Sequence, residues 1–100
     1  MLVHTAHTAH PEVREIVPSA HALGRFRRRR PVHAPGTDPV LEELLEVLAS
    51  ADVSRWPPAW AVSDRPATWW AVRDGLAFPL VPAEGPGRWL AVTCLRRGGR

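Results

Sequence analysis

Eleven prolines in a chain of 100 residues limit how long any helix or strand can be. Proline fixes φ and lacks an amide hydrogen, so it interrupts helices and is confined to the edges, ends or bulges of sheets. The prolines are spread from Pro11 to Pro86, and the chain also contains seven glycines. The sequence therefore predicts short elements joined by many turns, and its length fits one small domain.

The composition is that of a globular chain. Hydrophobic residues make up 45% of the sequence, which is enough for a packed core. No apolar run is long enough to cross a membrane, and the N-terminus lacks the basic start and apolar stretch of a signal peptide. We therefore expect a cytoplasmic protein without membrane contact. Cys94 is the single cysteine, so it cannot form an internal disulfide, and we expect a buried free thiol.

Two helices are predicted in the first half of the chain. Val13, Ile16 and Val17 form a lead-in or a first strand, and Ser19 is a suitable N-cap for a helix over residues 20–30. Gly24 lowers the stability of this helix, and Pro31 ends it. A second helix follows Asp38. Its apolar stripe comprises Leu41, Leu44, Leu45 and Leu48, with Glu42, Glu43 and Glu46 on the solvated outer side.

The second half has β character. Residues 53–62 form an edge strand or an extended loop, because Pro57 and Pro58 interrupt them. The stretches "ATWWAVR" and "LAFPLVP" flank an Asp-Gly pair, which is typical of a β-hairpin, and Pro79 indicates an edge or a bulge in the second arm. The stretch "RWLAVTCLR" is the last strand.

These elements predict an α+β domain in which two N-terminal helices pack on one face of a small, three- to four-stranded antiparallel sheet. We expect a flexible arm over residues 1–11, a single domain over 12–97 and a tail over 98–100. We assign the five tryptophans, all in the β region, to core and sheet packing rather than to base stacking.

The positive charge of the chain is concentrated in one segment. The net charge is +3, but five of the thirteen basic residues lie within residues 25–30. Without these five, eight arginines face ten acids. The chain has no lysine, so all thirteen basic side chains are arginines and a high arginine count is weak evidence for a function. The clustering of five arginines within six residues is the stronger evidence. A localised basic stripe is typical of a nucleic-acid-binding surface.

On a helical wheel, His21, Arg25, Arg28 and Arg29 share an arc of about 100°, while Leu23 and Phe26 lie on the far side. Arg27 and Arg30 fall outside the cluster. Arginines can hold a phosphate bidentately and stabilise charge in a transition state, and a histidine one turn away is a candidate general acid or base. The alternative is a solvated basic face on which His21 has no role.

The stretch "HALGRFRRR" resembles the H-x-x-x-R-x-x-x-R helix motif of small RelE-superfamily domains, including the BrnT-type toxins. An acidic, leucine-rich helix and antiparallel strands follow, and the last strand contains a "V-T" pair. The resemblance implies a metal-independent toxin-type endoribonuclease that cleaves RNA by attack of the 2′-OH on the adjacent phosphate. It implies catalytic roles for His21, Arg25, Arg29 and Thr93.

Further arginines would extend the contact with RNA: Arg27, Arg28, Arg30 and Arg96. We expect no metal and no cofactor. Two alternatives remain open at this point: a non-catalytic nucleic-acid-binding module, and a protein-interaction domain such as an inhibitor from a phage or mobile element. An antitoxin or another protein is a further candidate partner, and a broken edge strand would suit a homodimer.

Overall fold

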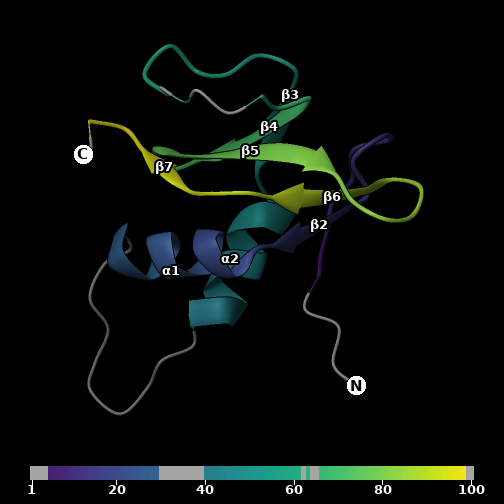
Figure 1. Ribbon diagram of the computed structural model, residues 1–100, viewed down its shortest axis with the longest axis horizontal. Coiled ribbons are helices and arrows are strands. Elements are labelled where there is room, and N and C mark those ends of the chain that lie inside the picture. The colour runs from purple at the N-terminus through teal and green to yellow at the C-terminus, as the bar shows by residue number, and fades with distance from the viewer. Residues whose placement is uncertain (1–4, 30–39, 62, 64–65, 99–100) are drawn as a thin grey trace.

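The computed structural model describes residues 5–29, 40–61, 63 and 66–98. Two helices and seven strands lie in this part of the chain (Figure 1). Their order is β1 (Ala6–His7), β2 (Glu15–Pro18), α1 (Ala20–Arg29), α2 (Val40–Ala49), β3 (Asp52–Ser54), β4 (Trp69–Arg73), β5 (Leu76–Pro82), β6 (Arg88–Ala91) and β7 (Leu95–Arg96). None of the described helices is long and apolar enough to span a bilayer.

The sheet is larger than the sequence predicts, and it is mixed. Its strand order is β1-β2-β6-β5-β4-β3, and β7 also pairs with β5. β2 runs parallel to β6, whereas every other pair is antiparallel. The prediction of a RelE-like fold, in which two helices pack on a three- to four-stranded antiparallel sheet, is therefore wrong, while the family resemblance itself stays a prediction. The fold prediction failed because β1, β3 and β7 have only two or three residues each, too few to show a period of two.

The parallel pairing of β2 with β6 determines the connectivity. Parallel neighbours need a crossover, and here it contains both helices and the β3–β5 strands. The carbonyl oxygen of Gly87 accepts hydrogen bonds from the amides of Arg14 (3.0 Å) and Glu15 (2.9 Å). Gly87 has a φ of 71°, a value that favours glycine. This turn therefore sets the register of β2 against β6.

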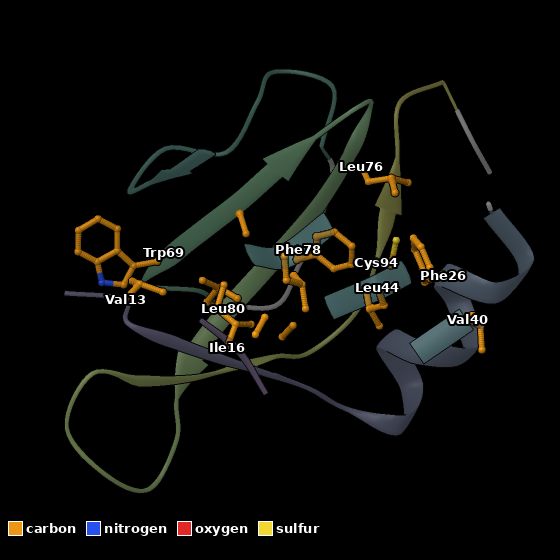
Figure 2. Close-up of a cluster of buried hydrophobic side chains, with 14 residues drawn as sticks. Val13, Ile16, Phe26, Val40, Leu44, Trp69, Leu76, Phe78, Leu80 and Cys94 are labelled. Atoms are coloured by element: carbon orange, nitrogen blue, oxygen red, sulfur yellow. The ribbon is translucent and has the colours of Figure 1, made fainter. Parts of the chain in front are cut away.

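The sheet curls around α2. This helix contacts β1 and β2 toward one edge of the sheet and β4 toward the other, and it also packs against α1. In Figure 1 both helices lie on the same side of the strands. Figure 2 shows the core between them, a single cluster to which Phe26 and Leu44 contribute from the helices and Phe78 and Leu80 from β5.

The β4–β5 hairpin is confirmed. Five residue pairs join the two strands, and Asp74 (φ 51°) and Gly75 (φ 76°) form the turn between them. Two positive φ values are those of a type I′ turn, which the Asp-Gly pair favours.

The predicted last strand is interrupted at its centre. β6 ends at Ala91 and β7 begins at Leu95, and both pair with β5. Pro79 lies in β5 opposite this interruption, where its carbonyl accepts a hydrogen bond from the amide of Val92 at 3.1 Å. A proline cannot donate to a neighbouring strand, so it fits where the ladder is broken. The edge or bulge predicted for the second arm is not observed: β5 lies between β4 and β6 and pairs with β4 without a gap, and the interruption is in the neighbouring strand.

The tryptophans of β4 have a structural role, as predicted. Trp69 and Trp70 point to opposite faces of the sheet because they are adjacent in a strand, and both are buried. Trp69 packs in the core and meets the rings of His10 and Trp89 edge-on. Trp56, in contrast, is 79% exposed.

Within the segment expected to be a flexible arm, residues 6–7 form β1 and pair with β2. Ala6 is buried in the core. His10 accepts hydrogen bonds at Nδ1 from the amides of Glu12 and Val13, both at 3.1 Å. The ring therefore stabilises the turn that leads into β2.

Gly24 offers a test of the helix assignment. It lies inside α1, and among the described residues a methyl group there would meet no heavy atom within 4 Å outside the helix's own backbone. Gly24→Ala should therefore raise the free energy of unfolding by about 1 kcal/mol, as measured by urea denaturation. The matched control Gly75→Ala should lower it, because Gly75 has a φ of 76°. A destabilised Gly24→Ala protein would contradict this account of α1.

Candidate functional site

Ser19 positions α1 against the sheet. Its Oγ accepts a hydrogen bond from the amide of Ala22 at 3.0 Å, which makes it the N-cap that the sequence predicts. The same Oγ donates to the carbonyl of Val92 at 2.9 Å, and the Ser19 amide donates to Ala91 at 3.0 Å. The start of α1 is therefore joined to the segment between β6 and β7.

The orientation of α1 follows from the side chains that it buries. Ala22 and Phe26 are buried, and Leu23 is half-buried against the core. Because these apolar side chains face the core, the basic side chains of α1 lie on the opposite side of the helix. Arg25 and Arg29 are half-buried along the boundary between the two sides, whereas Arg28 is exposed.

Four arginines gather around a small cavity beside α1. Arg25, Arg28 and Arg29 come from α1, and Arg96 comes from β7, which lies far away in the sequence. The cavity has a volume of about 270 Å³, and no other described residue lines it. Within the described ranges, no carboxylate forms an ion pair with any of these four guanidinium groups. We call this group the arginine cluster.

The crowding of these charges has an electrostatic cost. The pKa of Arg29 is lowered from its usual value, first by desolvation and then by the positive charge of Arg25, with smaller effects from Arg96 and Arg28. In addition, the Nε–H of Arg25 is buried and has no hydrogen-bond partner in the described structure. A bound anion would reduce the repulsion between these side chains.

Cys94 lies on the inner side of the arginine cluster. Figure 2 shows its sulfur near Phe26 and Leu44, and the side chain is fully buried. Burial raises the pKa of the thiol to about 11, although Arg29 and Arg25 act in the opposite direction. A thiol with this pKa is protonated at neutral pH and is a poor nucleophile. The prediction of a buried free thiol is confirmed.

A second, larger cavity adjoins the first. It has a volume of about 800 Å³ and lies between α1, α2, the β4–β5 turn and β7. Both cavities are lined by Arg29 and Arg96, so these two side chains stand between them. The large cavity also has apolar and acidic walls. Its lining includes Phe26, Val47, Leu76, Glu43, Glu46, Arg73 and Asp74.

The predicted site residues are only partly brought together. The structure gathers Arg25, Arg28, Arg29 and Arg96 around one cavity. His21 is exposed one helical turn before Arg25, and it lines neither of the two cavities.

Two further residues of the predicted set also stay outside the cavities. Thr93 is buried between β6 and β7, and Arg27 is exposed on another part of α1. Neither side chain lines either of the two cavities described above. Arg30 lies outside the described residues, as does Asp38, the N-cap expected for the second helix. The roles assigned to His21, Thr93, Arg27 and Arg30 therefore remain predictions.

Sequence reasoning missed the large cavity. Glu43 and Glu46 were assigned to a solvated face, and Asp74 to turn chemistry alone. Asp74 does lie in the turn, where its carboxylate pairs with Arg73 at 3.2 Å. The acids of α2 line a cavity because the sheet curls around this helix, and no local pattern in the sequence indicates such curvature.

No family model matches the sequence, and neither a curated protein nor a solved structure matches it. These comparisons identify no RelE- or BrnT-type domain. The case for function therefore rests on the arginine cluster and the cavities beside it.

Cys94 gives a pH prediction that can be assigned to one side chain. Its folded pKa of about 11 exceeds the ordinary value of 9.0, so the unfolded chain loses this proton first. Stability should therefore fall as pH rises from 9 to 11, by up to about 1.4 kcal/mol per pH unit. The chain has no lysine or tyrosine to titrate in this window.

The measurement is urea denaturation at intervals between pH 8 and pH 11, with Cys94→Ala as the control. The variant should show a flat pH dependence over this range, whatever its overall loss of stability. An equally steep fall in Cys94→Ala would show that another group is responsible.

Proposed function

We propose that this protein binds single-stranded RNA and holds a backbone phosphate in the arginine cluster. The observation behind the proposal is that four guanidinium groups surround one cavity with no paired carboxylate in the described structure. Guanidinium groups match the geometry of phosphate oxygens and bind them through pairs of hydrogen bonds. Phosphate contacts of this kind supply most of the sequence-independent affinity for nucleic acids.

The position of Arg96 supports a built site over a solvated basic face. The arginines of α1 alone would fit an ordinary exposed helix surface. Arg96, however, comes from β7, a separate element of the fold. Convergence of like charges from two elements opposes folding, since the charges repel each other. A multivalent anion in the cavity would remove this repulsion.

RNA cleavage is the second candidate function. The observation that favours it is the exposure of His21 one helical turn before Arg25. Cleavage by the 2′-OH requires a base to remove its proton, a positive group to stabilise the phosphorane-like charge, and an acid to protonate the 5′-oxygen that leaves. We propose His21 as the general acid or base for one of these two proton transfers, with water exchanging the other proton, and Arg25 and Arg29 on the phosphate oxygens. No metal is required for this reaction.

Binding can be tested with 2′-O-methyl oligouridine, which the 2′-OH mechanism cannot cleave. Affinity should fall as salt rises, and Arg29→Gln should weaken binding at low salt on the order of tenfold. The slope of log K against log salt should also decrease by about 0.7, the value for one phosphate contact on a single strand.

Arg14→Gln is the matched control for this test. It removes the same charge from an exposed site before β2, away from the cluster. The control should change affinity much less than Arg29→Gln does. Equal effects of the two substitutions would indicate a general charge effect and would contradict a phosphate site in the cluster.

Cleavage can be tested with unmodified, end-labelled RNA in EDTA. The wild type should cut the RNA and leave 2′,3′-cyclic phosphate ends, and His21→Ala should lose this activity but keep its affinity. RNA that is bound yet stays intact with the wild-type protein would reject the nuclease and leave the binding module. If RNA neither binds nor is cut, both candidate functions fail, and the protein-interaction domain is the alternative that remains.

A further inference from the structure

The large cavity adjoins the arginine cluster, but it is lined by different kinds of side chain. The cluster is lined by arginines alone, whereas the large cavity combines apolar, basic and acidic side chains. The two share Arg29 and Arg96. A phosphate held by the cluster would therefore place the rest of its nucleotide at the entrance of the large cavity.

The size and floor of the large cavity suit a nucleobase. Its volume of about 800 Å³ lies in the usual range for small-molecule sites. Phe26, Val47 and Leu76 contribute apolar surface to the lining. A flat, weakly hydrated base can cover such a surface, whereas a second phosphate would be excluded by the acidic residues.

The charged groups of the cavity suit one base better than the others. Glu46 lies on α2, and in the described structure its carboxylate forms no ion pair. A carboxylate accepts hydrogen bonds but cannot donate them. Guanine presents two neighbouring donors, N1–H and N2–H₂, to such a group. It also presents the acceptors O6 and N7, which guanidinium groups bind.

We infer that the large cavity is a guanine-binding pocket in which Glu46 accepts hydrogen bonds from the N1–H and N2–H₂ donors. Arg73 also lines the cavity and pairs with Asp74 through its Nε–H; in this assignment its remaining N–H groups supply the donors for the acceptor edge of the base. Uracil has a single ring N–H and two carbonyl acceptors, so it forms fewer hydrogen bonds with a carboxylate. This inference rests on the proposed RNA binding, and it adds a preference for guanosine beside the bound phosphate.

The test compares two 2′-O-methyl hexamers, oligouridine and the same oligomer with one central guanosine. The single guanosine prevents assembly of the oligomer into four-stranded structures. The wild type should bind the guanosine oligomer about tenfold more tightly, the ratio expected for one good bidentate contact. Glu46→Gln should reduce this preference to within about twofold, because the amide offers one acceptor in place of two.

Glu42→Gln is the matched control. Glu42 lies on the same helix, is also exposed and does not line the cavity, so this variant should keep the full preference. A thermal melt of both variants should match the wild type, since both positions are at the surface.

The remaining outcomes distinguish a failure of the guanine pocket from a failure of the phosphate site. Equal affinity for the two oligomers, with Arg29→Gln still weakening both, would overturn the guanine pocket and leave the phosphate site intact. A preference that persists in Glu46→Gln would also overturn the role assigned to Glu46. If neither oligomer binds, the proposed RNA binding fails, and the pocket assignment fails with it.

Discussion

The parallel pairing of β2 with β6 is the constraint on which the site depends. It brings the end of β2 beside Ala91, so that Ser19 can cap α1 and also bind the backbone of the β6–β7 segment. α1 then runs alongside this segment, and Arg96 of β7 meets the arginines of α1. If β2 paired elsewhere, the basic face of the helix would be an ordinary solvated surface.

The interruption of the last strand has a second consequence. Because β6 and β7 are separated at residues 92–94, Cys94 is buried against Phe26 instead of continuing a regular ladder. The buried thiol of Cys94 is protonated at neutral pH, so it adds no negative charge beside the half-buried side chains of Arg25 and Arg29. Their charges therefore face the cavity without a fixed counter-ion among the described residues. The fold thus presents concentrated positive charge that a phosphate can neutralise.

Local patterns predicted local structure well. The Asp-Gly turn and the Ser19 cap each depend on neighbouring residues, and both are present. Three leucines of the predicted stripe of α2, Leu44, Leu45 and Leu48, contribute to the core, whereas Val40 is buried in place of Leu41. The parallel strand, the curl around α2 and the position of Arg96 depend on contacts between distant segments, which no alternation or motif in the sequence records. For this reason the arginine face of α1 was predicted from the sequence, whereas the acidic wall of the neighbouring cavity was not.

The most direct test of a phosphate site is NMR observation of the arginine side chains during titration with 2′-O-methyl oligouridine. The buried Nε–H of Arg25 and the Nε–H of Arg29 should shift and exchange more slowly with water as the phosphate binds. The signal of Arg55, which stacks on Trp69 at 4.7 Å, should stay unchanged. Shifts confined to arginines outside the cluster would contradict the account.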